Sequence, residues 1–175
     1  MSVKSKWLFP WLMPALMFAL AQPAASEQSN PQPAPNGLQI PKNYKDWPVL
    51  GISHRTDKNS LRVILGNSVA IKAARSGQTN PWPDGTILAK LVWKDSEHPL
   101  WPAATVPGDK EHIEFMFKDS KKFKANDGWG YARWVGKDQK PYGTNAQFDL
   151  ECHSCHTSAK ESDFVFTRPV KLPPD

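Results

Sequence analysis

The feature that most constrains this chain is the pentapeptide Cys152-His153-Ser154-Cys155-His156, which has the spacing C-x-x-C-H. Two cysteines three positions apart lie on one side of a helical turn, so both thiols can bond to the two vinyl groups of one haem. The histidine that follows the second cysteine can then bind the iron. We therefore predict a covalent c-type haem held by Cys152 and Cys155, with His156 as the iron ligand.

Three other structures share this cysteine spacing: a structural disulfide, a thioredoxin-like redox pair and half of a zinc site. The chain has 2 cysteines in all, so no disulfide framework competes for them. A redox pair is expected within a βαβ unit, and a zinc site needs further cysteine or histidine ligands close by. The sequence around residues 152–156 offers neither context, which favours haem attachment.

The first 26 residues resemble a secretory signal peptide. Lys4 and Lys6 precede an apolar stretch from Trp7 to Leu20, and small residues follow it. The stretch is shorter than the ~20 residues of a membrane span and contains prolines, so we expect cleavage and no stable membrane anchor. Because haem c is attached outside the bacterial cytoplasm, the signal and the haem motif together predict a periplasmic protein.

The rest of the chain reads as one domain. A proline-rich linker is predicted at residues 27–37, followed by a haem domain at residues 38–175. The formal net charge of +5 comes without a block of lysine and arginine, so we expect no nucleic-acid partner. Eight tryptophans and eight phenylalanines suit packing around a large flat cofactor, and suit an ordinary core nearly as well.

Alternation of apolar and polar residues with a period of two dominates the domain, as is typical of strands. The pattern predicts strands at residues 60–65, 86–94, 112–118 and 129–135, and short helices at residues 68–75, at 119–126 and at the haem motif. Pro99, Pro102 and Pro107 predict a long loop. The expected fold is therefore mainly β, of the α+β class: an antiparallel sheet with a few short helices and a C-terminal haem-attachment helix.

Charged residues within these strands are candidates for chemistry. Lys90 alternates with Leu88 and Val92, and a buried amine has a lowered pKa that makes it a nucleophile, although a lysine reaching the sheet edge is commoner. Glu114 is a candidate general base with a raised pKa, although an exposed glutamate is the default interpretation. Arg62 is suited to orienting a polar ligand or to forming a structural salt bridge.

The second axial position of the iron separates the functions that a c-type haem can have. An electron carrier usually has this position filled, often by methionine. Met116, in the middle of a predicted strand, is the one methionine beyond the signal peptide. The other histidines are more often surface or core residues than ligands: His54, His98, His112 and His153. The sequence therefore favours an open iron, with an electron carrier as an alternative.

The chain resembles the cytochrome P-460 family over most of the predicted domain. The matching stretches are GLQIPKNYKDW at residues 37–47, Asp84-Gly85-Thr86 followed by Lys90, Lys118-Asp119-Ser120, the haem motif, and DFVFTR at residues 163–168. The resemblance implies a β-rich homodimer that binds a c-type haem cross-linked to a lysine. It implies that Lys90 is this lysine, bonded through its amine to the porphyrin edge.

The same resemblance assigns roles to two further residues. Glu114 falls where hydroxylamine-oxidising members have a distal carboxylate, and Arg62 matches an arginine of the haem pocket. The implied activity is oxidation of hydroxylamine to nitrous oxide or nitric oxide, with electrons passing to a redox partner such as a soluble cytochrome c. The related β-type cytochromes c′ lack the lysine and bind nitric oxide without turnover, which is the alternative function.

Overall fold

The computed structural model describes residues 31–171 and 173. The predicted signal peptide and the first part of the predicted linker lie outside the described residues. Within the described part of the chain, no helix has the length and apolar character needed to cross a bilayer.

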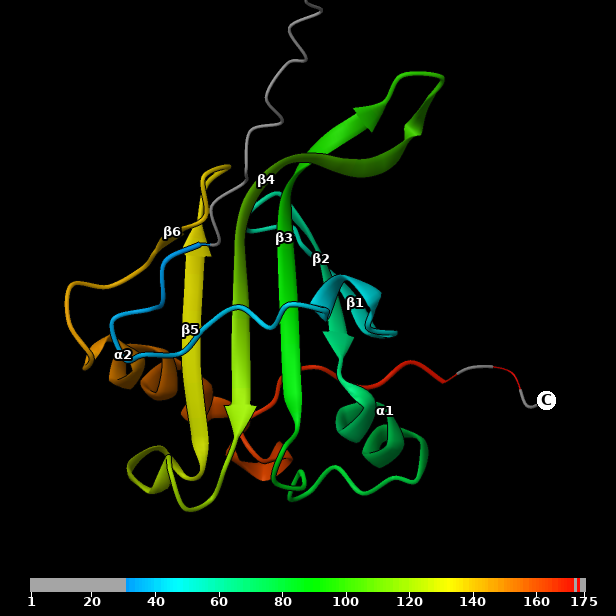
Figure 1. Ribbon diagram of the computed structural model, residues 1–175. Coiled ribbons are helices and arrows are strands. Elements are labelled where there is room, and N and C mark those ends of the chain that lie inside the picture. The colour runs from blue at the N-terminus through cyan, green and yellow to red at the C-terminus, as the bar shows by residue number, and fades with distance from the viewer. Residues whose placement is uncertain (1–30, 172, 174–175) are drawn as a thin grey trace, which may run out of the picture.

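One antiparallel sheet forms the body of the molecule, and each strand pairs with the next one along the chain (Figure 1). Its six strands are β1 (Val49–Arg55), β2 (Ser60–Gly66), β3 (Ile87–His98), β4 (Trp101–Lys118), β5 (Trp129–Val135) and β6 (Lys140–Pro141). Strands that follow one another along a chain often pair as neighbours in a sheet. The prediction of a mainly β, α+β fold is confirmed.

The helices are short. Helix α1 (Ser68–Arg75) has the predicted bounds, and Asn67 begins it by accepting the backbone N–H of Ala70 at 3.0 Å. Helix α2 (Phe148–His156) carries the haem motif, as predicted. Single 3-10 segments complete the set: η1 (Tyr44–Asp46), η2 (Lys124–Asn126) and η3 (Thr157–Ser162).

The predicted helix at residues 119–126 is mostly wrong, because only η2 is helical there. The Asp119 carboxylate accepts the backbone N–H groups of Lys121 and Lys122, which satisfies these donors in a turn. Asp127 then adopts a left-handed conformation with φ of 52°, which ends the segment.

The predicted loop around the three prolines is also wrong, because β3 and β4 continue through it as a two-stranded ribbon (Figure 1). We call residues 96–110 the β3–β4 arm. Pairing of β3 with β2 ends at Lys94, and pairing of β4 with β5 begins at His112. Prolines are tolerated in the arm because the outer edges of a two-stranded ribbon need no backbone donors.

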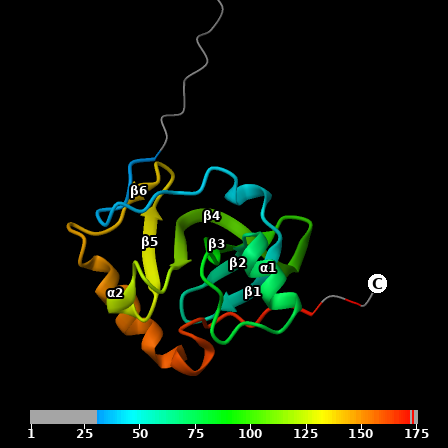
Figure 2. The same ribbon diagram turned by 60° about the horizontal axis from the view of Figure 1, so that its bottom comes forward.

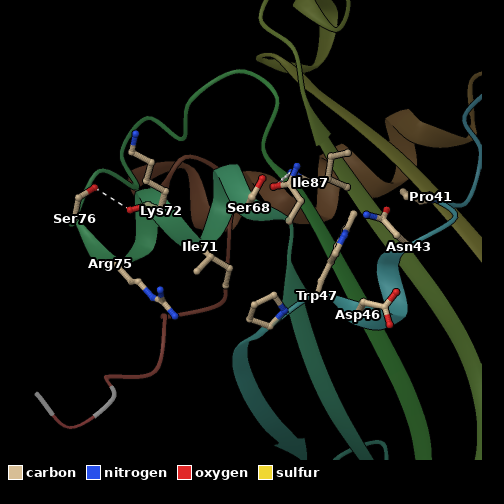
Figure 3. Close-up of a pocket in the computed structure, with 12 residues that line it drawn as sticks. Pro41, Asn43, Asp46, Trp47, Ser68, Ile71, Lys72, Arg75, Ser76 and Ile87 are labelled. Atoms are coloured by element: carbon tan, nitrogen blue, oxygen red, sulfur yellow. Dashed lines mark hydrogen bonds between the residues drawn. The ribbon is translucent and has the colours of Figure 1, made fainter. Parts of the chain in front are cut away.

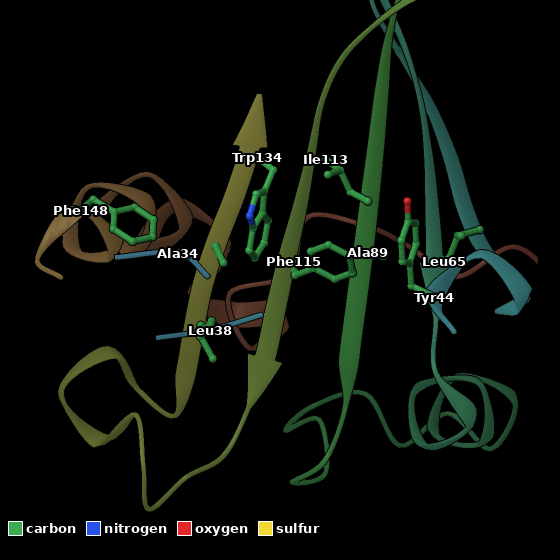
Figure 4. Packing of buried hydrophobic residues seen from close by; sticks show 10 residues of the cluster. Ala34, Leu38, Tyr44, Leu65, Ala89, Ile113, Phe115, Trp134 and Phe148 are labelled. Atoms are coloured by element: carbon green, nitrogen blue, oxygen red, sulfur yellow. The ribbon is translucent and has the colours of Figure 1, made fainter. Parts of the chain in front are cut away.

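One face of the sheet packs against the N-terminal segment (Figure 4). Alternation places Ile113, Phe115 and Trp134 on this face, where each is at most 2 % exposed. Residues of the predicted linker take part in the packing: Ala34 is buried, and the Gln32 carbonyl accepts the indole N–H of Trp134 at 2.8 Å.

The opposite face packs against α2 and the C-terminal segment. Figure 2 shows α2 and the N-terminal segment on opposite sides of the sheet. Buried residues here include Leu88, Trp129 and Tyr131 from the strands, and Phe164 and Val165 from the C-terminal segment. His112, Glu114 and Met116 belong to this face by alternation. We call it the haem-helix face.

Candidate haem-binding site

Helix α2 brings the two cysteines to the haem-helix face. Cys152 is half-buried and contacts both hydrophobic clusters, whereas Cys155 is exposed, and both thiols are free. Burial raises the pKa of Cys152 to about 11. Thioredoxin-like pairs and zinc ligands need a thiolate at neutral pH, so this environment disfavours both of those alternatives. A thiol whose S–H adds across a vinyl group fits the site.

His156 is held in the form that binds a metal. Its Nδ1 lies 2.7 Å from the carbonyl oxygen of Phe164, so Nδ1 carries the hydrogen and donates it. Burial lowers the pKa of His156 and favours the neutral ring. The rings of Tyr131 and Phe166 flank it, each with its centroid 5.1 Å away. Nε2 therefore carries the lone pair that an iron ligand needs.

A row of charged side chains crosses three strands on the haem-helix face. Lys90 on β3 lies directly opposite Glu114 on β4, and Glu114 lies opposite Arg133 on β5. The Lys90 amine forms an ion pair with Glu114 Oε2, and Arg133 Nη2 lies 2.6 Å from Glu114 Oε1. His112 Nε2 contacts the same Oε1 at 3.3 Å. The fold thus joins the two residues that the sequence singled out separately.

The predicted raised pKa of Glu114 is wrong for this arrangement. Burial alone would raise the pKa, because the side chain is only 15 % exposed. The hydrogen bond from His112 and the positive charges of Lys90 and Arg133 outweigh burial and hold the pKa below its ordinary value. Glu114 is therefore an ionised carboxylate surrounded by three partners.

Lys90 is only partly buried. Its neighbours on the same face, Leu88 and Val92, are buried, but its own side chain is 29 % exposed. The amine forms an ion pair with Glu114, and only a neutral amine can bond to carbon.

Arg62 lies on the same face, opposite Val92 of β3. Burial lowers its pKa, and among the described residues no ion pair joins it to Glu114. The Nε atoms of Arg62 and Arg133 are both buried without a hydrogen-bond partner in the described part of the chain. An unpaired buried donor is costly, so both fit a site that receives a group with acceptor oxygens. A haem with its carboxylates is such a group.

Two residues of the site were missed in the sequence, Arg133 and Tyr131. Both lie on β5, whose bounds were predicted correctly. The alternation within that strand was the available signal, since it puts Trp129, Tyr131 and Arg133 on one face. What the sequence lacked was the register that sets Arg133 opposite Glu114.

A large open cleft lies elsewhere, between α1 and the segment at residues 41–48 (Figure 3). It has a volume of about 960 Å³, and Trp47, Lys72 and Arg75 are among the residues that line it. None of the predicted site residues lines this cleft. Neither the row of charged side chains at Lys90, Glu114 and Arg133 nor helix α2 lines this cleft, so the candidate chemistry does not belong there.

Comparison with known proteins agrees with this geometry. The family model described as Cytochrome P460 matches residues 41–167, which include the sheet, Lys90, Glu114 and the haem motif. No curated protein matches the chain. Members of this family bind a c-type haem covalently with its iron. Since the match covers most of its length, the chain belongs to the cytochrome P460 family and is a c-type haem protein.

Proposed function

We propose that this protein oxidises hydroxylamine to nitrous oxide or nitric oxide, at a haem that is cross-linked to Lys90. The observation that carries the proposal is the ion pair between Lys90 and Glu114 on the haem-helix face. It places the candidate cross-linking amine beside the candidate base. The family is associated with hydroxylamine oxidation, which supports the same reaction.

Four residues would hold the haem. Cys152 and Cys155 would form thioethers, His156 Nε2 would bind the iron, and the Lys90 amine would bond to the porphyrin edge. The bound iron supplies a site for hydroxylamine and an acceptor for its electrons, which leave to a redox partner. Arg62 would donate to acceptor oxygens of the haem or of its ligand, since its Nε has no partner among the described residues.

Glu114 would accept the protons of the reaction. Oxidation of two hydroxylamine molecules to nitrous oxide and water releases four protons together with four electrons, so a base beside the site accelerates it. Arg133 and His112 hold the carboxylate in place through Oε1. A bond between Lys90 and the porphyrin would remove a positive charge from beside Glu114. The pKa of Glu114 would then rise towards the range of a useful general base.

A second candidate function is binding of nitric oxide without turnover. The ion pair with Glu114 favours this candidate in one respect, because it engages the Lys90 amine that the cross-link would need. An electron carrier is a third candidate, since Met116 lies on the haem-helix face and is available as a sixth ligand.

The deciding experiment measures nitrous oxide formed from hydroxylamine by the haem-loaded protein with an oxidised acceptor. Glu114→Ala should lower the rate roughly 10²–10⁴-fold, the usual contribution of a positioned base, with the haem spectrum retained. Glu111→Ala, three residues earlier on β4, is the matched control and should keep the wild-type rate. Equal rates for all three proteins would remove Glu114 from the reaction. A wild-type protein that binds nitric oxide but gives no product would leave the second candidate.

Location and assembly are part of the proposal. A periplasmic homodimer that passes electrons to a soluble cytochrome c is supported by the signal-like first 26 residues and by the exposed apolar side chains of Leu100 and Trp101 on the β3–β4 arm. Cell fractionation and sedimentation of the haem-loaded protein test these points. A cytoplasmic protein, or one with the mass of a single chain, would contradict them.

A further inference from the structure

We propose that Lys118 is a positioning residue for the iron ligand His156. Together with Asp163, it holds in place the Phe164 carbonyl that accepts the hydrogen bond from His156 Nδ1. This inference rests on the assignment of His156 as the axial ligand, which is part of the proposed function. It does not depend on which reaction the haem carries out.

The first observation is an ion pair between Lys118, at the end of β4, and Asp163, which follows η3. The Lys118 amine lies 2.8 Å from Asp163 Oδ1, and the two side chains are only 6 % and 8 % exposed. Among the described residues this is the most deeply buried ion pair. Lys118 also donates to the Asp127 carbonyl at 3.3 Å and lies 4.9 Å from the ring centroid of Trp129. These contacts fix the position of the ammonium group.

The second observation is that Asp163 is bound from another side as well. Its Oδ2 accepts the backbone N–H of Trp82 at 2.7 Å. The carboxylate therefore joins the C-terminal segment to β4 through one oxygen and to the turn before β3 through the other.

The third observation is the backbone conformation at this point. Asp163 and Phe164 have φ values of 49° and 64°. Residues other than glycine rarely adopt this left-handed region, and two in succession persist only where the surroundings hold them. The two bonds of the Asp163 carboxylate supply part of that restraint, together with the backbone bonds from Asp163 N–H to the Lys160 carbonyl (3.0 Å) and from Phe164 N–H to the Ala159 carbonyl (2.9 Å). The resulting turn directs the Phe164 carbonyl back towards α2, where it accepts from His156 Nδ1 at 2.7 Å.

The hydrogen bond to Nδ1 determines how His156 acts as a ligand. It fixes the tautomer and the ring orientation, and it makes Nε2 a stronger electron donor to a metal. Stronger donation stabilises the ferric state relative to the ferrous state. Lys118 would thus influence the iron through Asp163, Phe164 and His156, although among the described residues no hydrogen bond or ion pair joins it to His156 or to α2.

A purely structural ion pair would act differently. Its loss would lower the free energy of unfolding and leave the reduction potential of the folded protein unchanged. Loss of the positioning role would weaken the hydrogen bond to Nδ1. The reduction potential should then rise, and the iron–histidine stretching frequency of the ferrous protein should fall.

The test compares haem-loaded wild-type protein with Lys118→Met by redox titration and resonance Raman spectroscopy. Lys118→Met should show the higher potential and the lower stretching frequency, and Lys118→Arg should return both towards wild type because it keeps the charge. Tyr142→Phe is the control. It removes a hydrogen bond to Glu151 on α2 (3.2 Å) without touching the turn at Phe164, and it should leave both quantities unchanged.

Unchanged potential and frequency in folded Lys118→Met would overturn the inference. If Lys118→Met does not accumulate with haem, Asp163→Asn replaces it as the test. Its amide oxygen can still accept from Trp82, while the charge that pairs with Lys118 is lost, so the same shifts are expected. An iron–histidine stretch that is absent from the five-coordinate ferrous wild type would instead overturn the assignment of His156, and the inference with it.

Discussion

At the scale of single residues, the charges around Glu114 connect two proposed roles: Lys90 as the cross-linking residue and Glu114 as the base. Before any cross-link forms, Lys90 and Arg133 both form ion pairs with the Glu114 carboxylate. A bond from the Lys90 nitrogen to the porphyrin would remove one of these charges and leave the other. Glu114 would then gain basicity and keep its orientation, so cross-link formation would also prepare the base.

Glu114 should give the free energy of unfolding a defined pH dependence. Its pKa in the folded chain lies below the ordinary value of 4.5. At a pH between these two pKa values the unfolded state therefore binds more protons than the folded state. The stability from Glu114 is complete above about pH 4.5 and is lost as the pH falls through the folded pKa. Glu114→Gln should therefore cost roughly 1–3 kcal/mol near neutral pH, since its partners are partly exposed, and less in acid.

Urea unfolding in a background of Cys152→Ala and Cys155→Ala measures this difference with Lys90 unbonded. Gln retains the shape of the side chain, so the comparison isolates the charge. A difference between the two proteins that grows as the pH falls below 4.5 would contradict the ion-pair description of Glu114.

At the scale of elements, the predicted strands and α1 are found where one local pattern dominates. β5 and α1 have the predicted bounds because an apolar, aromatic-rich run of strand length marks the first and an Asn cap marks the second in the sequence. The β3–β4 arm was missed because prolines normally interrupt strands, and only the absence of neighbouring strands makes them acceptable. The contact of Lys90 with Glu114 was not predictable, because alternation gives the face of each residue and not the register between strands.

The arm should be dispensable for the haem site. Residues 96–110 pair with no strand other than β3 and β4 among the described residues, and an isolated two-stranded ribbon is marginally stable. Replacing residues 96–106 with Asn-Gly should change the free energy of unfolding by less than about 1 kcal/mol and leave the haem content unaltered. Chemical denaturation and haem quantification measure both.

A core substitution calibrates that measurement. Phe115→Ala removes a side chain that is 1 % exposed and should cost roughly 3–5 kcal/mol. A truncated arm that costs as much as Phe115→Ala, or that abolishes haem attachment, would show that the arm supports the body of the protein.

At the scale of the whole molecule, the two faces of the sheet have different roles. The N-terminal segment and the aromatic cluster with Phe115 and Trp134 provide stability on one face. The other face meets α2 and the C-terminal segment and carries the charged row. We propose that Lys90 and His156, which are far apart in the sequence, belong to one site, and this is the central claim about this protein.

Mass spectrometry of proteolysed, fully matured protein tests this claim most directly. If the haem lies between α2 and the charged row, the peptide containing Lys90 should be recovered covalently joined to the haem peptide containing Cys152 and Cys155. Lys90→Arg, which keeps the charge at this position but lacks the primary amine, should yield the haem peptide alone. Recovery of Lys90 from the matured wild type only in an unmodified linear peptide would contradict the cross-linked site.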